Sequence, residues 1–239
     1  MKISIVIPTY NEAENLPRLL AELFALPMDG LHVLVIDDNS SDGTGRIADE
    51  LAAKYAGRLE VMHRAGKLGL GSAYITGFTR LLGGDAQAIG QMDADFSHQP
   101  GKVIELADAL RDCDVAIGSR YVPGGALDPD WPFWRQWLSS FGNRYARGIL
   151  RLPIRDATGG FRLWRREALA ALPLEGVRSN GYIFQVEMAY MAHKLGLRFY
   201  EVPIFFAERQ WGQSKMSFRI QIEAALRVWS LLWQYRRLK

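Results

Sequence analysis

The fold class of this chain is decided by residues 33–43, which read Val-Leu-Val-Ile-Asp-Asp-Asn-Ser-Ser-Asp-Gly. The first four residues are apolar and mostly β-branched, as in a strand that is buried on both faces of a sheet. The polar residues that follow are typical of a turn. A helical pattern then runs from about Thr44 to Tyr55. The stretch therefore predicts a strand, a turn and a helix in direct succession.

The same succession is predicted on both sides of this stretch. Further apolar strands are expected at residues 3–7, 59–63, 88–92 and 115–118, and helices at 16–24, 71–82 and 102–110. Asn11 and Glu14 resemble a capping box at the start of the first helix. Because near-continuous apolar strands alternate with helices, we predict an α/β fold with a mostly parallel sheet covered by helices on both faces.

The second half of the chain follows a different pattern. Loops are expected at residues 124–132 and 156–160, helices at 134–150 and 182–195, and extended chain at 199–206. A C-terminal amphipathic helix is predicted from about residue 217, with these apolar residues near one face: Phe218, Ile222, Leu226, Trp229, Leu232 and Trp233. No linker or internal repeat interrupts the chain, so we expect one domain spanning residues 1–239.

Composition limits the class of protein. Of the 239 residues, 49% are hydrophobic and 23% charged, which excludes a disordered chain. The single cysteine, Cys113, cannot form an internal disulfide and favours a reducing compartment. No secretory signal and no apolar stretch long enough to span a bilayer is expected.

Positive charge is concentrated in the second half, although the net charge is only +3. Asp156 is the one acid among the arginines at positions 135, 144, 147, 151, 155, 162, 165 and 166. No dense basic run or nucleic-acid-binding module is present, so nucleic acid is not an expected partner. The distribution favours an anionic ligand or an anionic membrane surface.

Polar clusters follow three of the predicted strands, at residues 8–12, 37–40 and 93–95. In open α/β sheets, ligands bind beyond the carboxyl ends of the strands. Asp93 and Asp95 lie two residues apart after a buried strand and can turn toward one point, where they suit a hard ion such as Mg²⁺ or Mn²⁺. The alternative is that these residues only form solvated turns.

Seven stretches of the chain form a series of motifs: 5–12, IVIPTYNE; 36–44, IDDNSSDGT; 92–98, MDADFSH; 118–122, GSRYV; 156–162, DATGGFR; 181–188, GYIFQVEM; and 202–216, which includes Val202-Pro203-Ile204, Arg209 and Ser214-Lys215-Met216. This series resembles glycosyltransferase family 2, which has the Rossmann-like GT-A fold, and within it the polyprenol (dolichol) monophosphate mannose synthases. The resemblance covers nearly the whole chain, in the family's order.

The resemblance implies roles for individual residues. It divides the domain into a nucleotide-sugar half (1–122), an acceptor half (123–216) and the C-terminal helix (217–239). The metal, Mg²⁺ or Mn²⁺, would be held by Asp93, Asp95 and Ser97, with Asp95 the firmest ligand; some relatives carry Gln at the position of Ser97. His98 is either a further ligand or a structural, capping residue. The guanosine pocket would contain Pro8, Tyr10, Glu12, Ile36 and Asp38, and Ala94 would join the two acids at the diphosphate. Cationic contacts to the donor or the acceptor phosphate would come from Arg120, Arg135, Arg209 and Lys215, and the catalytic set would be Asp95, Arg120, Arg209 and Lys215.

The implied reaction is inverting transfer of mannose from GDP-mannose to a polyprenyl (dolichyl-type) phosphate. A phosphate monoester, whose second pKa is about 6, arrives already ionised, so such an enzyme needs cations rather than a general base. A related transferase using UDP-glucose or another donor is an alternative. A non-catalytic subunit and a sugar nucleotidyltransferase are less consistent with the motifs, because the acids are intact and no Gly-rich basic loop occurs near residue 8.

A lipid acceptor also implies contact with a membrane. One candidate surface is the C-terminal helix, with Trp229, Leu232, Trp233 and Tyr235 beside Arg236, Arg237 and Lys239. A second consists of Trp131, Phe133, Trp134 and Trp137. Both sets could instead be core residues. Some relatives have spanning helices or use a separate anchoring subunit. We expect a cytoplasmic protein, peripheral on the cytoplasmic face of the membrane.

Overall fold

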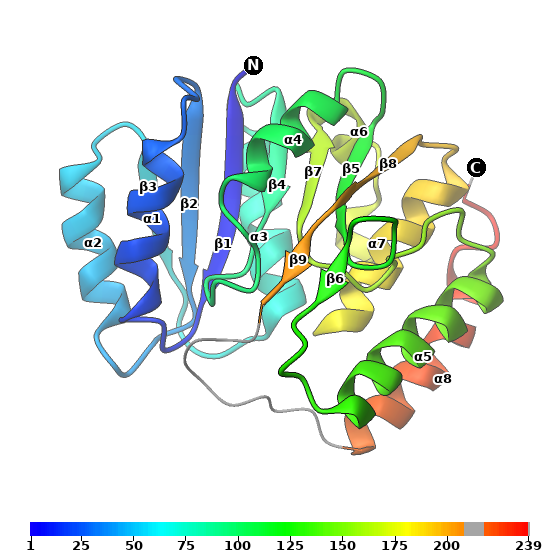
Figure 1. The fold of residues 1–239 in the computed structure, drawn as a ribbon. Coiled ribbons are helices and arrows are strands. Elements are labelled where there is room, and N and C mark those ends of the chain that lie inside the picture. Colours follow the sequence, from blue (N-terminus) through cyan, green and yellow to red (C-terminus); the bar gives the residue numbers. More distant parts are fainter. Residues whose placement is uncertain (208–217, 239) are drawn as a thin grey trace.

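The computed structural model describes residues 1–207 and 218–238, and its central feature is a seven-stranded sheet (Figure 1). The strands lie in the order β3-β2-β1-β4-β7-β5-β8, and all are parallel except β7, which is antiparallel to both neighbours. Their bounds are β1 Ile3–Thr9, β2 Leu31–Asp37, β3 Leu59–His63, β4 Ala88–Gln91, β5 Val115–Ser119, β7 Arg162–Arg165 and β8 Phe199–Pro203. The predicted α/β class with a mostly parallel sheet is confirmed.

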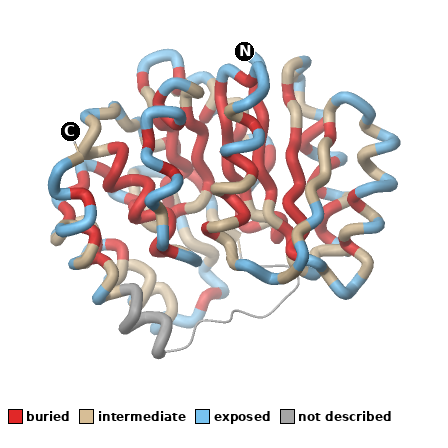
Figure 2. The backbone as a smooth tube through the Cα atoms, turned by 180° about the vertical axis from the view of Figure 1, so that it is seen from behind, coloured by how far each residue is buried: buried red, intermediate tan, exposed pale blue. Residues whose placement is uncertain are grey.

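Helices cover both faces of the sheet, and each face has its own apolar core. Figure 2 shows the buried strands between more exposed helices. One core lies under α1 (Asn15–Ala25), α2 (Thr44–Lys54) and α4 (Lys102–Ala109). The other lies under α3 (Leu70–Leu82), α5 (Phe133–Leu150), α6 (Arg166–Ala170), α7 (Tyr182–Lys194) and α8 (Phe218–Gln234). Smaller elements are the 3₁₀ helix η1 (Leu174–Gly176) and a two-stranded sheet of β6 (Ala126–Leu127) and β9 (Phe205–Phe206).

The apolar runs of the first half form strands because each side chain finds a core. Along β1, Ile5 and Ile7 belong to the core under α1, whereas Val6 belongs to the core under α3. Burying each such side chain contributes about 1.5–3 kcal/mol. Gly77 lets α3 approach β1 closely, since a Cβ there would lie 2.5 Å from Cγ1 of Val6. This close packing places the first turns of α3 beside the carboxyl ends of β1 and β4.

The structure corrects one local prediction, the capping box, and differs in detail from the sequence pattern at two other places. Asn11 and Glu14 do not form a capping box: α1 begins at Asn15 without a side-chain cap, and the Asn11 side chain instead accepts a hydrogen bond from the backbone N–H of Ser41. The sequence pattern did not predict β7, whose first residue, Arg162, is buried. The extended chain at 199–206 is interrupted at Ile204, so that β8 and β9 belong to different sheets.

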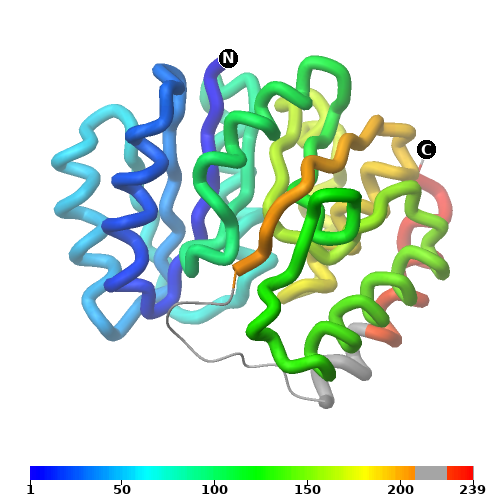
Figure 3. The backbone as a smooth tube through the Cα atoms, in the orientation of Figure 1, coloured from blue at the N-terminus to red at the C-terminus, as the bar shows by residue number. Residues whose placement is uncertain are grey.

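Helices α5 and α8 lie side by side at one end of the molecule (Figure 3). Tyr145 links them: its hydroxyl donates to the carbonyl of Ala225 at 3.3 Å and accepts from the indole N–H of Trp229 at 2.9 Å. Within residues 1–207 and 218–238, no helix combines the length and the apolar character that crossing a membrane requires.

Candidate functional site

Three polar turns meet at one edge of the sheet. They follow β2, β1 and β4, which are adjacent and parallel, so that their carboxyl ends lie together. Hydrogen bonds join the first two turns: the N–H of Asn11 donates to Ser40 Oγ at 2.9 Å, and the N–H of Glu12 donates to Thr44 Oγ1 at 2.8 Å. Residues 8–12, 37–40 and 93–95 therefore lie at one edge of the sheet, as expected for turns that follow neighbouring parallel strands.

Each of the three turns contains a non-glycine residue in the left-handed region. These residues are Asn11, Asn39 and Phe96, with φ of 62°, 58° and 60°. Such conformations cost about 1–3 kcal/mol each, and they concentrate at functional sites. The coincidence of all three at one sheet edge supports a binding role for these turns beyond simple chain reversal.

Asp93 forms hydrogen bonds with two side chains, Tyr74 and His98, of which only His98 was a candidate from the sequence. Its Oδ1 accepts a hydrogen bond from the Tyr74 hydroxyl at 3.1 Å, and its N–H donates to Nδ1 of His98, also at 3.1 Å. Burial and the Asp93 charge raise the pKa of Tyr74 well above 10, so the hydroxyl remains a donor. Tyr74 has no motif in its vicinity and was not predicted.

His98 has the geometry of the structural alternative. Its ring is buried, stacks on Phe161 with centroids 5.0 Å apart, and accepts from the backbone at the first acid. Burial lowers the pKa of His98 more than Asp93 and Asp95 raise it. The ring is therefore neutral at pH 7 and braces the turn after β4.

Asp95 and Ser97 form the second part of the acidic turn. Asp95 is buried, and its Oδ1 accepts from the Ser97 hydroxyl at 2.6 Å and from the Ser97 N–H at 3.1 Å. The hydroxyl proton is thus directed at the carboxylate, which leaves the lone pairs of Ser97 for another partner. Oxygen atoms from Asp93, Asp95 and Ser97 are the donor type that Mg²⁺ and Mn²⁺ prefer, so these residues fit a divalent cation.

The predicted nucleotide-pocket residues differ in what they can offer a ligand. Pro8, Tyr10 and Glu12 are half-buried at the end of β1, and Lys67 Nζ lies 3.7 Å from the centre of the Tyr10 ring. In contrast, the Ile36 side chain is fully buried in the core, so only its main chain can face a ligand.

Asp38 has a protein partner that the motif did not reveal. Its Oδ1 accepts from Nε of Arg64 at 2.5 Å, and Arg64 also donates to Ser72 Oγ at 2.8 Å. The N–H of Gly69 is 3.4 Å from the other Asp38 oxygen. Asp38 therefore ties the turn after β2 to the loop that leads into α3, on the border of the predicted pocket.

Arg120 lies in a buried ion pair. Its Nε and Nη2 donate to the two oxygens of Asp156, each at 2.7 Å, and Nη2 also donates to Thr158. Burial alone would lower the pKa of Arg120, but Asp156 outweighs burial and the pKa is raised. Of the three nitrogen atoms of this guanidinium, Nη1 alone has no hydrogen-bond partner within the described parts of the chain. Asp156 was part of a quoted motif but had no predicted role.

The other predicted cations are less closely placed. Arg135 lies in the first turn of α5, with its guanidinium 3.7 Å from the centre of the Trp131 ring. Arg209 and Lys215 lie outside the described residues. The structure therefore places Asp93 and Asp95 at the same sheet edge as the turns after β1 and β2. Arg120 is paired with Asp156.

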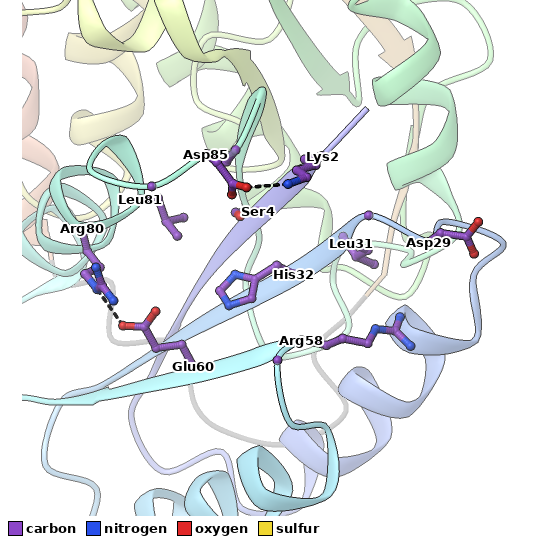
Figure 4. A pocket seen from close by; sticks show the side chains of 14 residues that line it. Lys2, Ser4, Asp29, Leu31, His32, Arg58, Glu60, Arg80, Leu81 and Asp85 are labelled. Carbon is purple, nitrogen blue, oxygen red and sulfur yellow. Dashed lines mark hydrogen bonds and ion pairs between the residues drawn. The ribbon is translucent and has the colours of Figure 1, made fainter.

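A cavity of about 400 Å³ lies at the opposite edge of the sheet, among the amino ends of β1, β2, β3 and β4 (Figure 4). Four of its charged side chains form ion pairs, Lys2 with Asp85 at 2.5 Å and Arg80 with Glu60 at 2.7 Å. None of the predicted site residues lines this cavity. The candidate site is therefore the carboxyl edge.

Sequence comparisons show the family of this chain. The family model described as Glycosyl transferase family 2 matches residues 4–172. A polyprenol monophosphomannose synthase of Mycolicibacterium smegmatis is 46% identical over 94% of this chain and 84% of the relative. An undecaprenyl-phosphate mannosyltransferase of Micrococcus luteus is 44% identical over 100% of this chain and 98% of the relative. A dolichol-phosphate mannosyltransferase of Pyrococcus furiosus is 36% identical over 98% of this chain and 65% of the relative.

Solved structures support the fold. The chain is similar to glucosyl-3-phosphoglycerate synthase of Mycobacterium tuberculosis in complex with Mn²⁺, UDP and phosphoglyceric acid, with a TM-score of 0.68. The match covers 100% of this chain and 79% of that one at 19% sequence identity. At this identity the likeness establishes the shared architecture.

Proposed function

The chain belongs to glycosyltransferase family 2, and we propose that it transfers mannose from GDP-mannose to a polyprenyl phosphate of the dolichyl type, with inversion at the anomeric carbon. The observation that carries this proposal is similarity along the chain to relatives named for mannose transfer to polyprenyl or dolichyl phosphate. The motifs at the sheet edge lie in the part of the chain that these relatives share.

The reaction needs no general base on the protein. A lipid phosphate monoester is mostly dianionic at pH 7, so one of its oxygens can attack the anomeric carbon directly. The new carbon–oxygen bond forms as the bond to GDP breaks, and the bonding electrons leave on the β-phosphate oxygen of GDP. No proton is transferred in this step. His98, which lies beside the acidic turn, is neutral and accepts from a backbone N–H, in agreement with such a mechanism.

The leaving group, in contrast, must be neutralised. Asp93, Asp95 and Ser97 would hold a divalent cation, Mg²⁺ or Mn²⁺, which supplies positive charge to the diphosphate when bound. Nη1 of Arg120 is the available donor of that guanidinium, and Asp156 fixes its direction. We assign further phosphate contacts to Arg135, Arg209 and Lys215 as proposals from the motifs. Stabilising charge that develops only as the bond breaks accelerates the chemical step.

We also propose that the protein works peripherally at the cytoplasmic face of a membrane, through α5 and α8. Phe133, Trp134 and Trp137 on α5 are more than half exposed, as are Trp229 and Trp233 on α8. Exposed aromatic residues on a helix with basic neighbours are typical of interfacial helices. Two residues of the predicted surface are corrected: Trp131 and Tyr235 are buried, because they pack against Phe206 and Tyr190 respectively.

The test is a transfer assay with a panel of labelled sugar nucleotides. Purified protein is incubated with Mn²⁺, undecaprenyl or dolichyl phosphate and either GDP-mannose, UDP-glucose or UDP-N-acetylglucosamine, and the lipid phase is extracted and counted. We expect label in lipid only with GDP-mannose and only when the polyprenyl phosphate is present. Lipid labelling from UDP-glucose alone would replace the donor assignment by the alternative.

A further inference from the structure

A chain of two buried hydrogen bonds fixes the orientation of the Gln185 side-chain amide. Gln185 belongs to the GYIFQVEM motif and has no role assigned so far. The indole N–H of Trp164 donates to Gln91 Oε1 at 3.0 Å, and Gln91 Nε2 donates to Gln185 Oε1 at 2.6 Å. An indole nitrogen can only donate, so it determines which end of the Gln91 amide is the oxygen. Because Gln91 Nε2 is then the donor to Gln185, the Gln185 atom that faces Gln91 is the oxygen, and Gln185 Nε2 points away from Gln91.

This nitrogen points toward the acidic turn. The position that a Cβ on Gly160 would occupy lies 3.3 Å from Gln185 Nε2, 3.7 Å from His98 Cε1 and 3.8 Å from Asp93 Oδ1. Three groups from α7 and from the turn after β4 thus surround one point next to a glycine. No acceptor for Nε2 is found among residues 1–207 and 218–238, although the Gln185 side chain is buried and its oxygen is bonded.

The two polar groups at this point are complementary. Gln185 Nε2 carries N–H donors, whereas Asp93 Oδ1 is an acceptor that already takes one hydrogen bond, from Tyr74. A hydroxyl group both donates and accepts, so it can bond to both at once. A phosphate oxygen carries no proton for the carboxylate at neutral pH and would be repelled by it. The pair therefore matches a neutral hydroxyl and not the anionic acceptor.

We propose that Gln185 is a positioning residue for the donor sugar: its Nε2 donates to a sugar hydroxyl whose proton is directed at Asp93 Oδ1. This inference rests on the proposed function, because it assumes that a sugar nucleotide binds at the turn after β4. The other oxygen of Asp93 remains for the metal. The hydrogen bond from Gln91, which is itself oriented by Trp164, holds the Gln185 amide in the orientation that the sugar requires, and this limits the entropy lost on binding.

Two substitutions test the proposal in different ways. Gln185→Glu keeps an oxygen for Gln91 but replaces the N–H donors by a second acceptor. Gly160→Ala keeps the Gln185 amide and adds a methyl group 3.3 Å from Gln185 Nε2 and 3.8 Å from Asp93 Oδ1, where it would crowd a hydroxyl bound to both; Gly160 does not have positive φ, so its backbone accepts alanine. Both variants should lose about tenfold or more in affinity for the sugar nucleotide, while affinity for GDP, which has no sugar, changes less than twofold.

The measurement is calorimetric titration of each variant with GDP and with the donor selected by the transfer panel. It is paired with kinetics on the 2-, 3-, 4- and 6-deoxy forms of that donor. We expect one deoxy form to lower kcat/KM about tenfold in the parent protein and to cost Gln185→Glu nothing further. KM for the lipid phosphate should not change.

Equal losses for GDP and for the sugar nucleotide would overturn the inference, because they would indicate a general structural defect. Deoxy penalties that stay the same in parent and variant would overturn it as well. Failure of the parent protein to transfer any sugar to the lipid would instead overturn the proposed function. The two failures are therefore distinguishable.

Discussion

At the scale of single residues, two charged side chains of the candidate site form ion pairs with residues from other segments of the chain. Asp38 is paired with Arg64, and Arg120 with Asp156, in both cases across more than twenty residues of sequence. Motif reasoning identified Asp38 and Arg120 but not their partners, because such pairs form only when distant strands and loops meet. Ionic contacts between segments are not visible as local patterns.

Removing the carboxylate of Asp156 should destabilise the protein. Asp156→Asn leaves the buried Arg120 guanidinium without its counter-charge, and breaking a buried pair in this way costs about 3–5 kcal/mol. Urea unfolding at pH 7 measures the loss. Asp108→Asn is the matched control, since Asp108 pairs with Arg111 at the surface and should change the free energy of unfolding by less than about 1 kcal/mol.

The same pair should contribute stability that depends on pH. Burial raises the pKa of Asp156, but the charge and hydrogen bonds of Arg120 outweigh burial, so the pKa lies below the ordinary value of 3.8. The contribution is fully present above about pH 3.8 and is lost as the pH falls through the folded-state pKa. The stability difference between parent and Asp156→Asn should therefore be constant from pH 7 to 5 and shrink below 3.8. A difference that grows in acid would contradict this sign.

At the scale of elements, one buried acid connects the C-terminal part of α8 and Tyr235 to α7. Glu187 on α7 accepts from Tyr235 at 2.7 Å, from Gln234 and Arg227 at 3.2 Å, and from the N–H of Ser179 at 2.9 Å. Tyr235 was predicted to face lipid, but its hydroxyl serves this buried carboxylate. On its inner side, α8 therefore contacts the buried Glu187 carboxylate, whereas Trp229 and Trp233 are exposed on its outer side.

Tyr235→Phe should loosen α8 without unfolding the domain. The substitution leaves one hydrogen bond of a buried carboxylate unmade, at a cost of about 1–3 kcal/mol. Hydrogen exchange should become faster in residues 225–234 than in the central strands. Tyr200→Phe is the control, because Tyr200 is exposed and no hydrogen bond of its hydroxyl is described. Unchanged exchange in α8 would show that the hydrogen bond from Tyr235 to Glu187 does not fix the helix.

The outer aromatic face should govern membrane binding. Replacing Trp229 and Trp233 together by Ala removes two exposed indoles and the hydrogen bond from Trp229 to Tyr145, while leaving the buried contacts of Tyr235 in place. We expect at least about tenfold weaker partitioning onto anionic phosphatidylglycerol vesicles, measured by flotation. Leu68→Ala, which changes an exposed apolar residue away from α5 and α8, is the control. Equal flotation of both variants would exclude α8 from the membrane contact.

At the scale of the whole molecule, the sequence predicted most of the sheet but not its order. The strands of the first half were recognisable because their residues are continuously apolar, and this follows from burial on both faces. Strand β7 was missed because it begins with Arg162 and ends with Arg165, so its sequence is not continuously apolar. Arg162 is nevertheless buried, since its guanidinium donates to the carbonyls of Gly159, Gln185 and Ala157. Backbone acceptors of this kind cannot be read from a sequence.

The candidate site was predicted to a similar extent. The three turns and the two acids could be found because each follows an apolar strand, and parallel neighbours bring their ends together. The groups that orient the acids and amides, Tyr74, Gln91 and Trp164, lie on other elements and carry no local signal of function. Knowing the turns therefore gives the place of the candidate site, whereas the directions of the side chains require the fold.

The most direct test of the whole account is the metal dependence of mannose transfer. Initial rates are measured with GDP-mannose and polyprenyl phosphate before and after treatment with EDTA, and again after Mn²⁺ or Mg²⁺ is restored. We expect EDTA to lower the rate by about 100-fold or more, the added cation to restore it, and Asp95→Ala to stay inactive under all three conditions. Undiminished transfer in EDTA, or near-normal transfer by Asp95→Ala, would contradict the assignment of a cation to the acids after β4.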